Sequence, residues 1–284
     1  MTLLKETLDK LYREYNFSDR LVYDPIDFPH RYSEPADVEV AGFIASCFAY
    51  GKVGLFKPVI EKILRPGGRH PAQFFLNFTL KDARYLKDVS YRFNSERDVV
   101  CLAYMLGRIL RKRGSLKNVF YRFYNPEDED VGTALRGFVD SFLGISVSPV
   151  YGKNIIPSGL AQLLPSPRRG SACKRMNLFL RWMVRTKDID FGIWNRISPS
   201  KLIIPLDTHI ARISRCLGLT RRKAADWKAA KEITESLKRL DPQDPLKYDF
   251  ALCHLGIAGL YKGMICPNCT FPPGACKIIK QAVP

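Results

Sequence analysis

The sequence predicts an all-α fold, and three observations lead to that prediction. Apolar residues recur every three or four positions through most of the 284 residues, which is the period of an amphipathic helix. The strand-like stretches, such as 201–204, are short. Hydrophobic residues make up 46% of the chain, which is enough for a packed core and excludes global disorder.

The predicted helices follow one another along the chain. Apolar faces predict one helix over 3–15 and a second over 38–48, with a proline-marked loop between them. A third helix is expected over 53–64. Seven more are expected over 98–112, 115–124, 131–143, 173–185, 207–217, 227–240 and 247–260. The stretch 145–167 contains four prolines and is the expected joint between two helical lobes.

The charge of the chain is strongly positive and unevenly distributed. Of the formal net charge of +17, most lies in residues 165–240, which hold 18 basic and 6 acidic side chains. Such a field attracts polyanions and favours nucleic acid over a merely solubilising surface or anionic lipid. No run of about 18 apolar residues is present, and the N-terminus lacks the apolar core of a signal peptide. An intracellular protein without a membrane span is therefore expected.

Lys174 follows a Gly-Ser-Ala-Cys sequence that predicts a tight turn leading into a helix. In the first helical turn its ammonium group would oppose the helix dipole, and partial burial would add to that effect. Both favour the neutral amine, which can attack carbon. The alternatives are a solvated lysine or a phosphate contact, because the backbone N–H groups of such a turn bind phosphate by themselves.

Asp207 ends an apolar run and is expected to cap the helix that follows. An N-cap aspartate stabilises a helix by about 1 kcal/mol, so its presence needs no further role. A carboxylate held rigidly at a helix N-terminus also stays ionised. It is then suited to stabilise a developing oxocarbenium cation or to move protons.

Part of the sequence resembles the hairpin, lysine and aspartate of the helix-hairpin-helix DNA glycosylases, such as endonuclease III and the 8-oxoguanine glycosylases. The resemblance lies in Gly170–Lys174, in the apolar helix after it and in the sequence PLDTHIAR. The family hairpin usually reads Leu-Pro-Gly-Val-Gly-x-Lys, of which the first glycine and the lysine match here. Most of the chain also resembles a group of uncharacterised proteins related to that superfamily, through phrases such as DPIDFPHRY, EVAGFIASCFAYGKV and DPLKYDFALCHLGI.

The resemblance implies a two-lobed glycosylase fold over residues 1–284, with the hairpin and the catalytic segment in 165–217. It implies that Lys174 attacks C1′ of a flipped nucleotide, that a Schiff base forms, and that β-elimination nicks the strand. Asp207 would support charge development and proton transfer. The implied substrate is double-stranded DNA with a damaged base, such as the oxidised purine 8-oxoguanine.

Residues in and beside the hairpin are expected to contact DNA: Arg168, Arg169, Gly170, Ser171, Arg175 and Arg212. Three aromatic side chains are expected to wall a pocket for the flipped base, although aromatic residues also build cores: Phe179, Trp182 and Trp194. Other candidates for stacking on the base, or for filling the gap that it leaves, are Tyr50, Tyr91 and Phe93.

Three cysteines near the C-terminus, Cys266, Cys269 and Cys276, have the spacing C-x2-C-x6-C of metal ligands. Endonuclease III relatives carry four such cysteines around a [4Fe–4S] cluster. The cluster or a zinc ion is therefore one expectation for residues 266–276, with Cys253 or His254 as a fourth ligand, and free or oxidised thiols are the other. No cofactor is required by the proposed chemistry.

Two functions follow from the sequence. The first is a DNA glycosylase with AP-lyase activity. The second is a protein of the same fold that binds DNA or RNA without cleaving it, which the basic segment alone supports. A monomer is expected, because no heptad seam is present.

Overall fold

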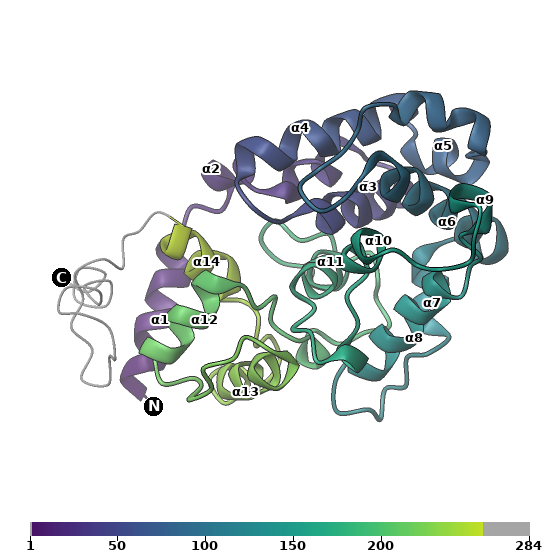
Figure 1. The fold of residues 1–284 in the computed structure, drawn as a ribbon. Helices are drawn as coiled ribbons and strands as arrows, with labels where there is room; N and C mark the ends of the chain where they lie inside the picture. The colour runs from purple at the N-terminus through teal and green to yellow at the C-terminus, as the bar shows by residue number, and fades with distance from the viewer. Residues whose placement is uncertain (1, 258–284) are drawn as a thin grey trace.

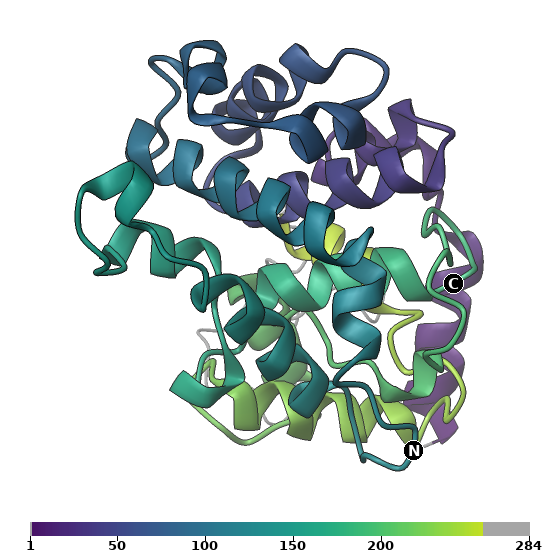
Figure 2. The same ribbon diagram turned by 90° about the vertical axis from the view of Figure 1, so that its right-hand side faces the viewer.

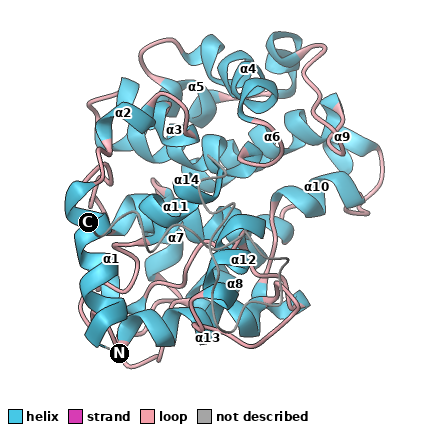
Figure 3. Cartoon of the chain, turned by 90° about the vertical axis from the view of Figure 1, so that its left-hand side faces the viewer, coloured by secondary structure: helices cyan, strands magenta, loops and turns pink. Residues whose placement is uncertain are grey.

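The computed structural model describes residues 2–257, and every regular element in that range is a helix, so the all-α prediction is confirmed (Figures 1 and 3). The α-helices are α1 (Thr2–Glu14), α2 (Ser18–Leu21), α3 (Pro35–Phe48), α4 (Val53–Leu64), α5 (Pro71–Asn77), α6 (Glu96–Arg113), α7 (Leu116–Tyr121), α8 (Gly132–Leu143), α9 (Ser148–Tyr151), α10 (Ser158–Leu163), α11 (Lys174–Val184), α12 (Thr208–Cys216), α13 (Trp227–Lys238) and α14 (Asp249–Ile257).

Three short helices occupy stretches for which no helix was predicted. Helix α5 starts at Pro71, α9 carries Pro149 in its first turn, and Pro157 precedes α10. Proline is tolerated at these positions because its missing N–H group has no helical partner there. The stretch 145–167 therefore contains two helices, and α10 packs against α6.

Helix α3 is the centre of one group of helices. Twelve of its fourteen residues are buried, and it packs against α4, α5 and α11 (Figure 2). The nearly continuous apolar sequence of 38–48 explains this position, because a helix that is apolar all round is stable only when it is surrounded.

A second group of helices combines the two ends of the described chain. Helix α12 packs against α14, and α1 contacts the residues just before α14 (Figure 1). The ring of Tyr15, the residue after α1, is 5.9 Å from that of Phe250 on α14. Asp9 on α1 pairs with Lys247 at 2.9 Å. The first helix is therefore held by residues that lie more than two hundred positions further along the chain.

A buried network of ion pairs joins α11 to the second group. Arg181 contacts Asp249 at 2.7 Å and Asp190 at 3.2 Å. Arg185 contacts Asp244 at 2.8 Å and also pairs with Asp190. Both arginines are 1% exposed. Burial alone would lower the pKa of Arg185. The aspartates around it have the larger effect and raise that pKa above its usual value, so the guanidinium stays charged.

Arg185→Met is expected to lower the free energy of unfolding by about 3–5 kcal/mol, because it leaves buried carboxylates without their cation. In a chain of this size the melting temperature would fall by about 10 °C. Arg168→Met is the matched control, since Arg168 pairs with Asp140 at 3.0 Å on the surface and its loss should cost at most about 1 kcal/mol. Thermal and urea denaturation measure both. Equal small losses for the two variants would contradict a structural role for the network.

None of the helices within residues 2–257 combines the length and the apolar character that crossing a bilayer requires.

Candidate functional site

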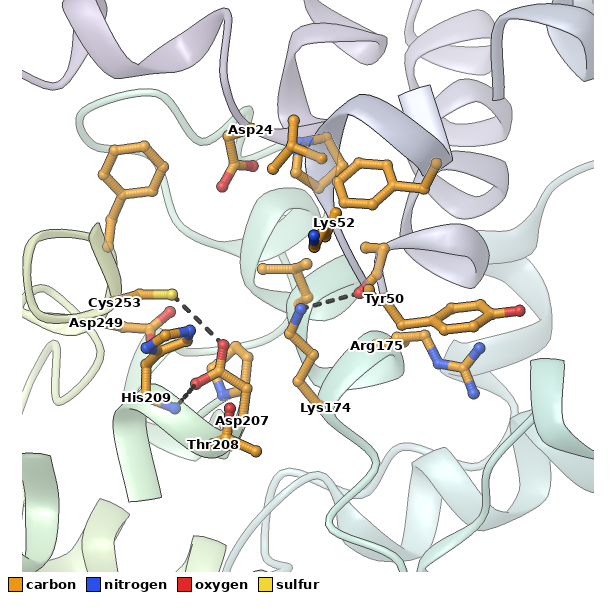
Figure 4. Close-up of a pocket in the computed structure, with 18 of the residues that line it drawn as sticks. Asp24, Tyr50, Lys52, Lys174, Arg175, Asp207, Thr208, His209, Asp249 and Cys253 are labelled. Atoms are coloured by element: carbon orange, nitrogen blue, oxygen red, sulfur yellow. Dashed lines mark hydrogen bonds between the residues drawn. The ribbon is translucent and has the colours of Figure 1, made fainter. Parts of the chain in front are cut away.

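A cavity of about 690 Å³ lies where α11, α12, α14 and the loop between α3 and α4 meet (Figure 4). Its lining includes both Lys174 and Asp207, the two residues expected to carry out the chemistry. Other polar side chains that line it are Tyr50, Lys52, His209, Asp249 and Cys253. Segments from distant parts of the sequence are thus brought to one place.

Lys174 is the first residue of α11, as the sequence predicted. The chain reaches it through two residues with left-handed backbone, Gly170 with φ +72° and Cys173 with φ +50°. Left-handed backbone is natural for glycine and unfavourable for cysteine. The half-buried Lys174 side chain crosses to the α3–α4 loop, where Nζ donates a hydrogen bond to the carbonyl oxygen of Ala49 at 3.0 Å. This bond fixes the amine at the cavity wall.

Asp207 is the N-cap of α12, which confirms the predicted cap. Its Oδ1 accepts hydrogen bonds from the backbone N–H groups of His209 at 2.9 Å and Ile210 at 2.8 Å. Its Oδ2 accepts a longer one from Sγ of Cys253 at 3.5 Å (Figure 4). One carboxylate oxygen is therefore committed to the helix, while the other has only a weak partner and remains at the cavity.

Two residues of α14 that the sequence reasoning did not assign to the site lie at this cavity. They are Asp249 and Cys253, one helical turn apart. Burial raises the pKa of the Cys253 thiol, and the nearby carboxylates of Asp207 and Asp249 raise it further, so the thiol stays protonated and donates. Burial also raises the pKa of Asp249 to about 6, although Arg181 opposes that shift. Their i, i+4 spacing was the available sequence signal, since it places both on one face of a helix.

Arg175, expected to contact DNA, is 8% exposed. Its guanidinium donates to the carbonyl oxygen of Cys47 at 2.8 Å and to that of Gln162, and lies 5.0 Å from the centre of the Tyr50 ring. Burial lowers its pKa, although the nearby Cys47 and Tyr50 oppose this. The structure thus uses Arg175 to fasten α3, α10 and α11 together beside the cavity.

The hairpin residues expected to contact DNA lie on the surface before α11. Arg168, Arg169 and Gly170 are exposed, and Ser171 is half-buried. The carbonyl oxygen of Gly170 accepts a hydrogen bond from the N–H of Trp227 at 3.0 Å, which ties the turn to the start of α13. The sixth residue of this set, Arg212, is half-buried on α12.

The three aromatic residues expected at a base pocket lie in the core and do not line the cavity. Phe179, Trp182 and Trp194 are 1%, 0% and 0% exposed. Helix α11 lines the cavity with Lys174, Arg175, Leu178 and Arg181 instead. Phe179 packs in the core, where its ring lies 5.6 Å from that of Phe43 and 5.3 Å from that of Trp194. The aromatic residues that do line the cavity are Tyr23, Tyr50, Phe56 and Phe250.

Trp194 has a structural partner in the core. Its Nε1 donates to Oε1 of the buried Glu39 at 2.9 Å. The same carboxylate accepts the N–H groups of Leu116 and Lys117, at 2.7 and 2.9 Å, at the start of α7. Burial raises the pKa of Glu39, and these donors counteract that shift. Trp194 therefore belongs to a buried polar contact that holds α7 against α3.

Cys266, Cys269 and Cys276 lie outside the described residues, so the metal site expected there stays a prediction. Within residues 2–257, no group of three or more histidine, cysteine, aspartate or glutamate side chains is arranged to hold a metal ion.

A model for a family described as "Protein of unknown function (DUF2400)" matches residues 24–258. The match covers every cavity-lining residue from Asp24 to Cys253. None of the curated proteins and none of the solved structures matches the chain significantly.

Proposed function

The chain belongs to this family of proteins of unknown function, DUF2400, and from the residues of its cavity we propose that it is a DNA glycosylase with AP-lyase activity. Lys174 would be the nucleophile and Asp207 the acid–base group. The proposed substrate is duplex DNA that carries a damaged base, such as the oxidised purine 8-oxoguanine.

One observation carries this proposal. Lys174 and Asp207 are 33 positions apart in the sequence, at the starts of two different helices, and yet line the same cavity. An amine that forms a Schiff base needs a neighbouring group that removes its proton and returns one to the sugar. The cavity volume of about 690 Å³ lies in the range of small-molecule sites, so it is large enough for an everted nucleoside.

The chemistry assigns a defined proton path to these two groups. Nζ of Lys174 attacks C1′ while the glycosidic bond breaks and the base leaves with the bonding electron pair. Asp207 Oδ2 accepts a proton from Nζ and returns it to the ring oxygen, so the sugar opens and a C1′=Nζ double bond forms. Loss of a C2′ proton then expels the 3′ phosphate, and water releases the lysine.

The surroundings of the amine support its role. Nζ donates a hydrogen bond to the carbonyl oxygen of Ala49, which holds the amine at the wall of the cavity. Proximity of this kind lowers the entropic part of an activation barrier. The basic segment 165–240 and the exposed turn at Arg168 and Arg169 supply positive charge for the DNA backbone.

Borohydride trapping of the wild-type protein tests the proposal. Duplexes with 8-oxoguanine, uracil, an oxidised pyrimidine, an abasic site or no damage are incubated with the protein and reductant. We expect a covalent protein–DNA adduct with the abasic duplex and with one damaged base, and none with undamaged DNA, because only a Schiff base is reduced to a stable bond.

Absence of an adduct on every duplex, with salt-sensitive binding intact, would reject the lyase. A base-release assay on the same samples then separates a monofunctional glycosylase from the second candidate, a protein that binds nucleic acid without turnover. The exposed basic turn and the charge of 165–240 are the features that favour that candidate.

A further inference from the structure

A second cavity of about 690 Å³, which we call the α6–α8 cavity, lies where α6, α7 and the C-terminal end of α8 meet. Its lining comes from residues 104–113, 119–122 and 140–146. It shares no lining residue with the cavity of Lys174 and Asp207. Helices α6, α7 and α8 lie at the right of Figure 1, whereas α12 and α14 lie at its left. The α6–α8 cavity is therefore a separate place on the molecule.

Positive charge gathers at the α6–α8 cavity. Five cationic side chains line it: Arg108, Arg111, Lys112, Arg113 and Arg122. In the described part of the chain, the acidic residue of the lining is Asp140, and its carboxylate pairs with Arg168 at 3.0 Å instead. Cations in the last turn of α6 complement the helix dipole, which accounts for three of the five. It does not account for the exposed Arg108, which Lys112 repels from one turn away. An anion bound in the cavity would relieve that repulsion.

An aromatic ring lies at one end of this row of cations. Tyr104, Arg108 and Lys112 follow one another at intervals of four residues on α6, and all three line the cavity. Such spacing puts them on one face of the helix, with about 12 Å along its axis between the first and the last. Apolar side chains of the neighbouring helices, Val119 of α7 and Ile145 just after α8, complete the lining. The cavity thus suits a ligand with a flat apolar part and several negative groups.

The guanidinium groups at the cavity differ in how they are held. Arg111 donates hydrogen bonds to the carbonyl oxygens of Leu76 and, at 3.3 Å, of Phe78, so this cation is fixed to the end of α5. Arg108 and Arg122 are exposed, which leaves their donors available to a ligand. A guanidinium group offers parallel N–H donors that match two oxygens of one phosphate. Phosphate is therefore the anionic group that this cavity fits best.

We propose that the α6–α8 cavity binds a nucleoside triphosphate, with the base against Tyr104 and the phosphates at the cations of α6 and α7. Bases stack on aromatic side chains, and the cavity volume lies in the range of small-molecule sites. Duplex DNA fits less well, because its bases are stacked inside the helix and cannot reach a ring in a cavity. The proposal is independent of the glycosylase chemistry, since it uses other residues and another ligand.

Competition for a fluorescent nucleotide tests the proposal. The probe is ATP that carries an N-methylanthraniloyl group on its ribose, and its fluorescence anisotropy is followed as the full chain is added at physiological ionic strength. Unlabelled ATP, GTP, inorganic triphosphate, adenosine and an undamaged duplex are the competitors. We expect ATP or GTP to displace the probe at least about 10-fold more effectively than inorganic triphosphate, adenosine or the duplex, because only the nucleotides combine a free base with clustered phosphates.

Three variants connect the binding to this cavity. Arg108→Gln combined with Arg122→Gln should weaken ATP binding by at least about 10-fold, because charge-assisted hydrogen bonds to phosphate are lost. Tyr104→Leu keeps an apolar side chain at the half-buried position. It should remove the advantage of ATP over inorganic triphosphate and leave inorganic triphosphate binding unchanged. Arg69→Gln is the matched control, since Arg69 is exposed and does not line the cavity, so ATP binding should be unaffected.

Several results would overturn the proposal. Displacement by inorganic triphosphate or by the duplex as effective as by ATP would show a general basic surface and no nucleotide site. Unchanged ATP affinity in the double arginine variant, with an unchanged melting temperature, would place any binding elsewhere. Equal losses for ATP and inorganic triphosphate with Tyr104→Leu would remove the role of the ring. Failure of borohydride trapping leaves this proposal intact, and failure of nucleotide binding leaves the lyase intact.

Discussion

Lys174→Gln is expected to abolish the borohydride adduct and to reduce base release by on the order of 10³-fold or more, because an amide nitrogen cannot form a Schiff base. The substitution is mild for the structure. Glutamine keeps a polar side chain at the half-buried position and removes only the hydrogen bond from Nζ to the carbonyl oxygen of Ala49. Trapping on the abasic duplex, with the adduct resolved by electrophoresis, measures the loss.

Lys52→Gln is the matched control for that experiment. Lys52 lines the same cavity and carries the same charge, so its replacement removes positive charge without removing the proposed nucleophile (Figure 4). The adduct should persist with Lys52→Gln. Peptide mapping that locates the adduct on Lys52, or an adduct that survives Lys174→Gln, would show that Lys174 is not the nucleophile.

Asp207→Asn is expected to slow base release by about 10²- to 10⁴-fold while leaving the fold intact. Asparagine caps helices as well as aspartate does, so the bonds to the N–H groups of His209 and Ile210 should remain. What is lost is the negative charge and the ability to accept a proton. Single-turnover kinetics and thermal denaturation together separate the two contributions.

Asp226→Asn provides the same chemical change at a cap outside the cavity. Asp226 is the N-cap of α13, where its side chain accepts from the N–H of Ala229 at 2.8 Å. Base release should be unchanged in that variant. Equal rates of base release for Asp207→Asn and the wild type would show that Asp207 caps the helix and takes no part in the chemistry.

The parts of the site that were predictable from sequence are those decided within a few residues. The turn before Lys174 and the cap at Asp207 depend on local hydrogen bonds, and both formed where the sequence placed them. The convergence of Asp249 and Cys253 on Asp207 depends on how α14 packs against α12, which no local pattern encodes.

The side of α11 that faces the cavity could not be predicted from the sequence either. Ten of the eleven residues of α11 are buried, so its apolar pattern does not identify the side that meets the cavity. Phe179 and Trp182 were therefore expected at the cavity, which they do not line, whereas Arg181, which resembles a surface cation in the sequence, is 1% exposed and lines it.

The packing of α1 against the C-terminal helices has a consequence for biosynthesis. The hydroxyl of Tyr248 donates to Asp9 at 2.6 Å, across 239 positions of sequence. A ribosome that adds roughly 5–20 residues per second needs about 10–50 s to cover that interval. During this time α3 can already pack against α4 and α5, which follow it closely in the chain, whereas α1 still lacks its partners near α14.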